Sequence, residues 1–376
     1  MHSAEDTKSI LVIASEFPPG PGGIGHHAYS LAKALRESSY EVSVLSPADY
    51  VTSEEVNNFD ASQSFKIIRF RRAGVLTYFY RIYLSTRFLI NNKRYKYVIL
   101  TGRFPLWLGI VVNLLFPSKK KIVILHGTEI NLPNKILRWL THKSISIADT
   151  IVPVSEFTRS LLPASILEKH RNIVVIKNGI DNVWSENSVL GGIKLEGNPV
   201  LLTVGHVSPR KGQHRVISAL PALITRYPYV HYHIVGLPLN QTSLEQLARD
   251  LGVMEYITFH GRVASHTDLQ IYYNAADIFM LLSENQPSGG VEGFGIVALE
   301  ANLHGLPVIG AKYCGVEEAV SHKQSGYLVD GDREEEILEG VVYCLQNKPE
   351  LDNGSRDWAR KHQWIEIAKQ YTTLFS

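Results

Sequence analysis

The chain has 376 residues, of which 45% are hydrophobic and 20% are charged, so it is long enough for two globular domains. Its two cysteines, Cys314 and Cys344, lack the number and spacing of a disulfide framework or a zinc site. No apolar run is long enough to cross a bilayer, and the first ten residues lack the apolar core of a signal peptide. We expect a cytoplasmic protein, with a peripheral position on the cytoplasmic face of the inner membrane as an alternative.

The formal net charge of +2 conceals two halves of opposite sign. Residues 1–182 contain 23 Lys and Arg against 14 Asp and Glu, a net charge of +9. Residues 183–376 contain 15 against 22, a net charge of −7. The basic first half suits an anionic partner. A nucleic acid is not expected, because the total charge is nearly balanced and no recognition motif is present.

The first half has the alternation typical of a doubly wound α/β domain. An apolar strand at 9–14 is followed by a glycine- and proline-rich loop at 16–25, a helical pattern and a strand at 41–46. Further strands are predicted at 97–100, 121–125, 150–155 and 172–176, and a buried helix at 104–116. His126 directly follows one strand, where parallel sheets bind ligands. A lone histidine there also fits a structural role, because imidazole satisfies buried backbone groups.

A second opening of the same kind starts at 199–204, so two similar α/β units in tandem are predicted. The loop 205–212 contains Arg210 and Lys211, and neither glycine loop matches a dinucleotide or P-loop fingerprint. Strands are expected at 231–236, 256–260, 277–282, 306–310 and 326–329, and a final helical pattern covers 357–375. From the turn at 178–181 we predict an N-terminal domain of residues 1–181, a C-terminal domain of 182–356 and a returning helix at 357–376.

The stretch 291–300, VEGFGIVALE, has two carboxylates, one before and one after the predicted start of a helix. A helix is predicted from near Gly295 to Leu303, and its positive end suits a phosphate. Carboxylates accept hydrogen bonds from adjacent hydroxyls, so Glu292 and Glu300 would contact different parts of one elongated ligand. An ordinary helix start with surface glutamates would show the same local pattern.

These segments resemble the retaining, two-domain glycosyltransferases of family 4 over nearly the whole chain. FPPGPGGIG at 17–25, HGTE at 126–129, VPVSEFT at 152–158, KNGID at 177–181, GHVSPRKG at 205–212 and EGFGIVALEA at 292–301 follow the family's order. The resemblance implies a GT-B fold: two Rossmann-like domains facing across a cleft, with the last helix crossing back to the first domain. It also implies transfer of a mannosyl- or glucosyl-type hexose from a nucleoside-diphosphate sugar to a hydroxyl of a saccharide, lipid-linked or other glycoconjugate acceptor. Retention at the anomeric carbon and independence of metals are expected.

The resemblance also implies roles for single residues. Arg210 and Lys211 would clamp the donor diphosphate, where the departing phosphate gains negative charge. Glu300 would hold the ribose hydroxyls and Glu292 the hydroxyls of the transferred sugar, which His126 would also contact. His126, Glu292, Arg210 and Lys211 are the expected catalytic residues. The other expected donor-binding positions are Gly22, Gly23, Gly205, Arg262, Val263, Gly293, Phe294, Gly295 and Ile296.

Several alternatives stay open at this point. GDP-mannose is the favoured donor, ahead of UDP-glucose and UDP-N-acetylglucosamine. A nucleotide-sugar epimerase on the same fold and a non-catalytic nucleotide-sugar-binding subunit are the rival functions. Both a monomer and a homodimer are compatible with the sequence. No residue is a candidate for a covalent nucleophile.

Two further segments have more than one interpretation. Residues 71–94 mix basic and aromatic side chains, which suits a membrane interface or an amphipathic helix that covers the first sheet with snorkelling arginines. Residues 330–332 spell DxD, a metal motif of other glycosyltransferases. We expect Asp332, with Glu335, to cap a helix instead.

Overall fold

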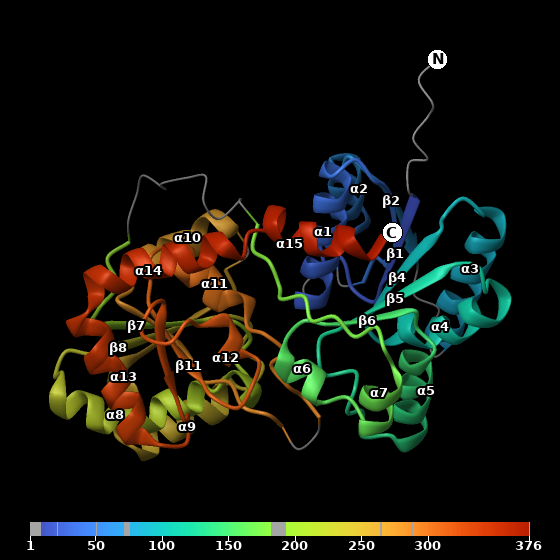
Figure 1. Cartoon of the computed structure of the whole chain (residues 1–376). Coiled ribbons are helices and arrows are strands. Elements are labelled where there is room, and N and C mark those ends of the chain that lie inside the picture. The colour runs from blue at the N-terminus through green and yellow to red at the C-terminus, as the bar shows by residue number, and fades with distance from the viewer. Residues whose placement is uncertain are drawn as a thin grey trace. The chain divides into compact units, whose positions relative to one another are not determined.

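The computed structural model describes residues 9–20, 22–49, 51–70, 76–181, 193–263, 265–286 and 289–375 (Figure 1). It divides into two compact units. Unit 1 consists of Met1–Gly179 and Trp364–Ser376, and unit 2 of Ile180–Gln363. The final element of unit 1 therefore begins at Trp364 and not at residue 357, because the preceding helix packs within unit 2.

Unit 1 contains a six-stranded parallel sheet in the order β3-β2-β1-β4-β5-β6. The strands are β1 (Ser9–Ala14), β2 (Glu41–Pro47), β3 (Lys66–Phe70), β4 (Tyr97–Thr101), β5 (Lys120–Leu125) and β6 (Thr150–Pro153). Near-continuous apolar runs form the central strands, because helices cover both faces of a parallel sheet. The sequence prediction omitted β3. It was wrong at 172–176, where the structure has only an isolated bridge between Ile151 and Ile173.

The helices of unit 1 connect these strands. They are α1 (Gly23–Glu37), α2 (Ser53–Ala61), α3 (Thr77–Asn91), α4 (Arg103–Leu115), α5 (Lys135–Ser146), α6 (Glu156–Ser160), α7 (Ala164–Lys169) and α15 (Trp364–Thr372), which the 3-10 turn Thr373–Phe375 extends. α15 packs against α1, as the resemblance implied for the last helix, and Tyr371 Oη lies 3.3 Å from His27 Nε2. Residues 71–75 of the basic aromatic stretch lie outside the described residues.

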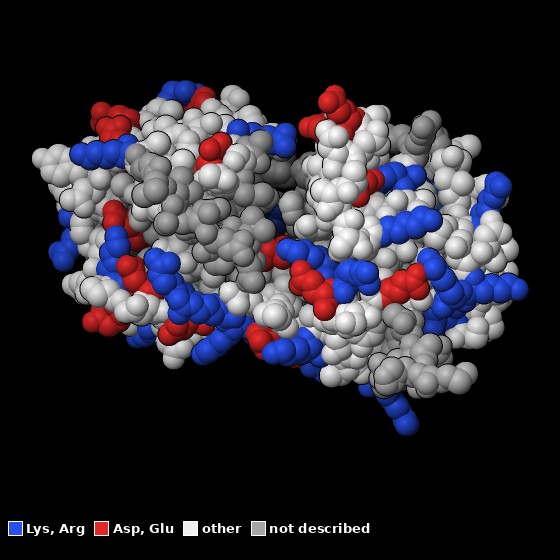
Figure 2. Space-filling model, turned by 90° about the horizontal axis from the view of Figure 1, so that it is seen from above, with Lys and Arg blue, Asp and Glu red and all other residues white. Residues whose placement is uncertain are grey.

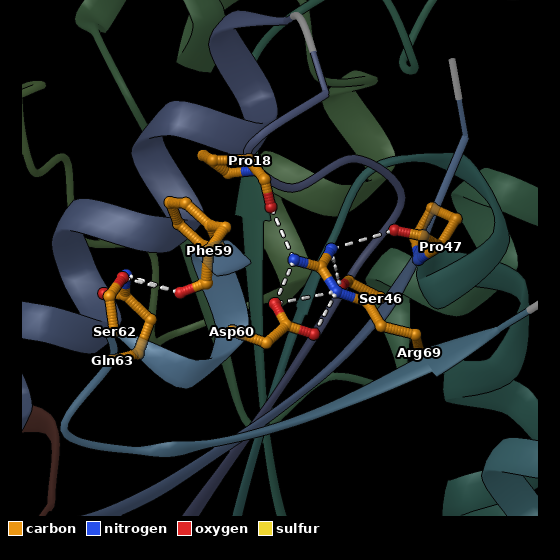
Figure 3. A network of polar contacts seen from close by, with 8 residues as sticks. All are labelled: Pro18, Ser46, Pro47, Phe59, Asp60, Ser62, Gln63 and Arg69. Carbon is orange, nitrogen blue, oxygen red and sulfur yellow. Dashed lines mark hydrogen bonds and ion pairs between the residues drawn. The ribbon is translucent and has the colours of Figure 1, made fainter. Parts of the chain in front are cut away.

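One arginine ties together several segments of unit 1 (Figure 3). The guanidinium of Arg69, on β3, donates to both carboxylate oxygens of Asp60 near the end of α2. It also donates to the carbonyl oxygens of Pro47 at 3.0 Å and Pro18 at 2.5 Å. The Pro18 carbonyl belongs to the loop after β1, so Arg69 fixes the start of the glycine-rich loop to the neighbouring strands.

Unit 2 repeats the architecture with a parallel sheet in the order β12-β11-β10-β7-β8-β9. Its strands are β7 (Val200–Val204), β8 (His231–Val235), β9 (Ile257–Gly261), β10 (Ile278–Leu281), β11 (Val308–Ala311) and β12 (Gly326–Val329). Its helices are α8 (Gln213–Arg226), α9 (Gln241–Asp250), α10 (His266–Ala275), α11 (Ile296–Leu303), α12 (Val316–Ala319), α13 (Glu334–Gln346) and α14 (Lys348–Lys361). Two 3-10 turns are η3 (Pro209–Lys211) and η4 (Met254–Tyr256).

Two local predictions for residues 330–375 need correction. Asp332 does not cap α13: the cap position is Arg333 and no side chain caps it, whereas Asp332 pairs with Arg215 at 2.7 Å. The helical pattern 357–375 is divided between α14 and α15, because the chain leaves unit 2 between them.

Candidate functional site

In unit 2 the strand order reverses between β7 and β10, which are neighbours in the sheet. Chain segments that leave the carboxyl ends of such strands diverge and leave room for a ligand. The loop 205–212 follows β7, and residues 282–286 and 289–295 form loops between β10 and α11. The Glu284 N–H donates to the Arg210 carbonyl at 3.0 Å, so the two loops contact each other.

The turn between β7 and α8 depends on a glycine. Gly212 ends η3 in the left-handed region with φ 73°, which suits a residue without a Cβ. A Cβ at this position would fall on the carbonyl group of Leu282, at the carboxyl end of β10. The loop after β7 therefore packs closely against the chain after β10, and this packing places Arg210 and Lys211 at the sheet edge.

Two cations converge on one carboxylate at this edge. The Lys211 ammonium lies 2.9 Å from Glu292 Oε2, and the Arg210 guanidinium pairs with the same oxygen. Lys211 is buried, with 9% of its surface exposed. Burial would raise the pKa of Glu292, but the charges of Lys211 and Arg210 together outweigh it, so the pKa is lowered. Glu292 is therefore a carboxylate at neutral pH.

Glu300 lies on α11, in a different electrostatic setting. Burial raises its pKa to about 7, although a hydrogen bond from Tyr273 and the charge of Lys211 act in the opposite direction. The Tyr273 hydroxyl donates to Glu300 Oε2 at 2.8 Å. Lys211 therefore acts electrostatically on both glutamates, which ties the two predicted carboxylates and the cation to one site.

The start of α11 is shaped by close packing. Gly295 is the residue before the helix, and a Cβ there would lie 3.1 Å from a methyl carbon of Leu281. The Phe294 ring is buried near His362, with ring centroids 6.2 Å apart, so it anchors the loop. The Gly315 N–H donates to the Glu292 carbonyl at 2.9 Å. Ligand contacts of Gly293, of the Phe294 and Gly295 amides and of Ile296 stay predictions.

The remaining positions of unit 2 that are predicted to bind the donor lie around the same edge. The Gly205 N–H donates to Val235 O at 2.8 Å, and a Cβ at Gly205 would lie 3.4 Å from the Lys211 side chain. Arg262 is exposed just after β9, followed by half-buried Val263. The pKa of His206 is lowered by burial and by the charges of Lys211, Arg210 and Arg262. Arg262 thus contributes to the positive field of the site. The contact of Val263 with a base stays a prediction.

In unit 1, His126 follows β5 as predicted. Its ring Nε2 lies 2.9 Å from the Thr101 hydroxyl, and its backbone N–H donates to Glu129 Oε1 at 2.5 Å. Burial lowers the pKa of His126 to about 4, so its imidazole is neutral at physiological pH. It can therefore donate or accept a hydrogen bond, but it is not a cation. Contact with a sugar stays a prediction.

One of the two predicted glycines of unit 1 packs against a carboxylate, Glu16, that the sequence analysis did not select. Gly22 precedes α1 with φ 135°, and a Cβ there would collide with the Glu16 carboxylate. Gly23 begins α1, and a Cβ there would meet no atom within 4 Å. Burial raises the pKa of Glu16, which a hydrogen bond from the Gly25 backbone opposes. Gly22 is therefore required by packing, whereas Gly23 borders open space.

Sequence reasoning also missed Tyr273, the hydroxyl partner of Glu300. Tyr273 is one of two adjacent tyrosines in α10, and nothing in the local pattern distinguishes it from Tyr272. Its role depends on the packing of α10 beside α11, which brings together residues 27 positions apart. Among the described residues, no group of three His, Cys, Asp or Glu side chains has the arrangement of metal ligands.

Two protein-family models match the chain. The model described as Glycosyl transferases group 1 matches residues 192–370, and the model described as Glycosyltransferase Family 4 matches residues 21–183. The chain is a family 4, group 1 glycosyltransferase. The two matches fall on units 2 and 1 respectively, so each unit of this glycosyltransferase corresponds to a family module.

Characterised relatives of this glycosyltransferase are similar over its full length. The GDP-mannose-dependent alpha-(1-6)-phosphatidylinositol monomannoside mannosyltransferase of Mycobacterium tuberculosis is 25% identical over 375 residues, covering 97% of this chain and 95% of the relative. The enzyme of the same name from Mycolicibacterium smegmatis is 27% identical over 382 aligned positions, covering 98% of each chain.

Solved structures share the fold of the glycosyltransferase. Sucrose-phosphate synthase from Thermosynechococcus elongatus superposes with a TM-score of 0.77 at 17% identity, covering 98% of both chains. Anabaena HepE in complex with UDP gives a TM-score of 0.77 at 20% identity, covering 98% of this chain and 99% of that one. These similarities, with the two parallel sheets, confirm the predicted GT-B fold.

Proposed function

We propose that this glycosyltransferase transfers a mannosyl residue from GDP-mannose to a hydroxyl of a lipid-linked saccharide, with retention at the anomeric carbon and without a metal ion. The observation that carries the proposal is the cluster of Arg210, Lys211 and Glu292 at the strand-order reversal of unit 2, with Glu300 beside it. The names of the full-length relatives support the choice of GDP-mannose and of a glycolipid acceptor.

The proposed roles follow from the charges of the cluster. An ammonium donates three hydrogen bonds, so Lys211 can bind Glu292 and still offer donors to a diphosphate. Arg210 adds a planar guanidinium that matches phosphate oxygens. As the bond to the sugar breaks, the diphosphate gains negative charge, and fixed cations stabilise that charge most in a water-poor site. Two side-chain cations would thus supply the charge that a metal ion supplies in other enzymes.

The two glutamates would recognise the sugar parts of the donor. Glu292 is held as a carboxylate by its cations and can accept hydrogen bonds from two adjacent hydroxyls of the transferred hexose. Because ion pairs with two cations stabilise the negative charge of Glu292, its carboxylate is poorly suited to be a nucleophile. We assign it a positioning role. Glu300, with Tyr273 on one oxygen, would accept from the ribose hydroxyls. In this scheme the departing phosphate deprotonates the acceptor.

Thermal-shift measurements with GDP-mannose, UDP-glucose and UDP-N-acetylglucosamine test donor binding. A ligand present at about 100 times its dissociation constant stabilises the native state by about 2.7 kcal/mol. We expect the largest shift with GDP-mannose, and loss of the shift in Lys211→Ala. Lys312→Ala is the matched control, because Lys312 also pairs with one glutamate of unit 2, Glu336 at 2.9 Å. A full shift in Lys211→Ala would contradict the assignment.

Product analysis separates the alternatives. Incubation with donor and a phosphatidylinositol mannoside in the presence of a chelator should yield a glycolipid whose new linkage keeps the donor's anomeric configuration. An altered sugar nucleotide formed from donor alone would favour the epimerase. Donor binding without turnover across a panel of acceptors would favour a non-catalytic binding subunit.

A further inference from the structure

Large apolar side chains are exposed on two helices of unit 1. Around α3 and α5 the exposed ones are Leu76, Tyr78, Phe79, Tyr80, Tyr83, Ile90, Ile136, Leu137 and Trp139. The most exposed aromatic residues among them are Phe79 at 73% and Trp139 at 63%. Apolar groups gathered in this way on a protein surface mark an interaction site more often than single exposed residues do.

Both helices bury polar side chains together with apolar ones. A helix that faces water normally buries its apolar stripe and exposes polar residues. α3 buries Arg81 and Ser85 beside Leu89, and α5 buries Thr141 and Ser144 beside Ile145. Arg81 needs an ion pair with Asp49 at 2.7 Å to be accommodated there. Part of the apolar surface of each helix therefore packs against the core, and the rest faces outward.

The helices α3, α4 and α5 form one continuous surface. The Tyr78 ring lies 5.4 Å from the Trp107 ring of α4, and the Trp107 indole N–H donates to the Thr141 hydroxyl of α5 at 2.9 Å. The three helices pack side by side in unit 1 (Figure 1). Together, the exposed residues of α3 and α5 with half-buried Trp107 form what we call the aromatic surface.

The charge of this region has a single sign. The sequences of α3, α4 and α5 contain no Asp or Glu. They do contain basic residues outside the interior, namely Arg87, Arg103, Lys135, Arg138 and Lys143. Figure 2 shows Lys and Arg side chains gathered on one side of unit 1, at the right of that view. Tyrosine, tryptophan and basic residues together are typical of surfaces that bind anionic lipid headgroups.

We propose that the aromatic surface inserts into the headgroup region of an anionic lipid bilayer. Phe79 and Trp139 would enter the apolar boundary, and Lys135 and Arg138 would bind lipid phosphates. No helix among the described residues is long and apolar enough to span a bilayer. The contact proposed is therefore interfacial.

The position of the aromatic surface suits the proposed acceptor. α3, α4 and α5 follow β3, β4 and β5, so each begins at the carboxyl edge of the sheet. His126 and Gly23 lie at that same edge of unit 1. A bilayer bound there would hold a lipid-linked acceptor near the residues predicted to meet it. This link rests on the proposed lipid-linked acceptor, whereas membrane binding itself does not depend on which sugar is transferred.

Vesicle co-sedimentation of the full chain tests the proposal. Wild type should bind vesicles of phosphatidylcholine mixed with phosphatidylglycerol, and bind phosphatidylcholine alone far more weakly. Phe79→Ser combined with Trp139→Ser should lower the partition coefficient by about ten-fold or more, since two apolar side chains are lost from the boundary. Lys135→Gln and Arg138→Gln should each lower the partition coefficient by about five-fold. High salt should also lower the partition coefficient of wild type, because it screens the attraction between basic side chains and lipid phosphates.

The matched control is Tyr229→Ser, because Tyr229 is an aromatic residue of unit 2 that is 78% exposed. It should bind vesicles as wild type does. The donor-induced thermal shift should persist in every variant of the aromatic surface, which separates failure of this proposal from failure of the donor assignment. Equal vesicle binding by wild type and the Phe79→Ser, Trp139→Ser variant would overturn the proposal. So would self-association through this surface without vesicle binding, which would assign it to a second copy of the chain.

Discussion

Replacing Glu300 by Gln should stabilise the protein at alkaline pH. The pKa of Glu300 is raised by burial to about 7, against a value of 4.5 for the unperturbed group. A raised carboxyl pKa means that the folded state holds the proton more tightly than the unfolded state. The stability contributed by the neutral form is fully present below pH 4.5 and is lost as the pH rises through 7. Glutamine keeps an acceptor for Tyr273 and has no charge to bury.

The magnitude follows from proton linkage. Between pH 5 and pH 8 the difference in unfolding free energy between Glu300→Gln and wild type should change by about 2.5 kcal/mol in favour of the variant. For a unit of the size of Ile180–Gln363, this corresponds to roughly 5–10 °C in melting temperature. The charged side chain would then be retained for binding a ribose, at a cost in stability.

Thermal or urea denaturation at a series of pH values checks this prediction. Glu255→Gln is the matched control, because Glu255 is an exposed glutamate of the same unit. Its difference from wild type should not change with pH. If the Glu300→Gln difference were equally independent of pH, the burial argument for Glu300 would be refuted, whatever the size of the difference.

Three further substitutions have defined outcomes. Glu292→Gln leaves the Lys211 ammonium without its carboxylate and should destabilise the protein by about 3 kcal/mol at pH 7 in urea titrations. Because the pKa of Glu292 is lowered, this penalty should shrink as the pH falls below 4.5, and a constant penalty would contradict the ion-pair account. Arg69→Ala removes hydrogen bonds to three segments of unit 1 and should lower the free energy of unfolding by about 2–4 kcal/mol, of which Arg69→Lys should recover only part. An unchanged urea midpoint would refute the role of Arg69 in joining these segments. Gly212→Ala should lower the free energy of unfolding by more than about 2 kcal/mol. Gly252→Ala is the control, because Gly252 has φ 69° but no atom within 4 Å of an added Cβ, and it should lose about 1 kcal/mol. Equal losses would refute the steric argument for Gly212.

Most of the strands could be predicted because a parallel sheet buries both faces of its strands. The run SILVIA was predicted at 9–14 and forms β1 over the same residues. The run NIVVI at 172–176 has similar composition but pairs only through one bridge. Apolar composition indicates burial, but pairing along a whole strand depends on the neighbouring backbone. Conversely, β3 has two charged residues, Lys66 and Arg69, among its five and therefore lacks an apolar run long enough to predict a strand.

The start of α11 was predictable from residues close in sequence. Gly295 precedes the helix and Leu303 ends it, as the glycine and the following Gly305 and Pro307 indicated. The capping role of Asp332 was wrong, because Arg215 from α8 forms an ion pair with that carboxylate. An aspartate before a helix can cap it, but here an arginine distant in sequence binds that aspartate, and the residues around Asp332 do not indicate this arginine.

The sequence by itself determined the α/β class and the tandem repeat of two units, because both depend on local backbone preferences and on the order of short segments. Only the tertiary structure decided that Arg210 and Glu292 meet although 82 positions separate them, and that burial beside Tyr273 gives Glu300 its raised pKa. It also decided that α3 buries an arginine and exposes a phenylalanine. Contacts and burial depend on how distant segments pack, and no local pattern records that packing.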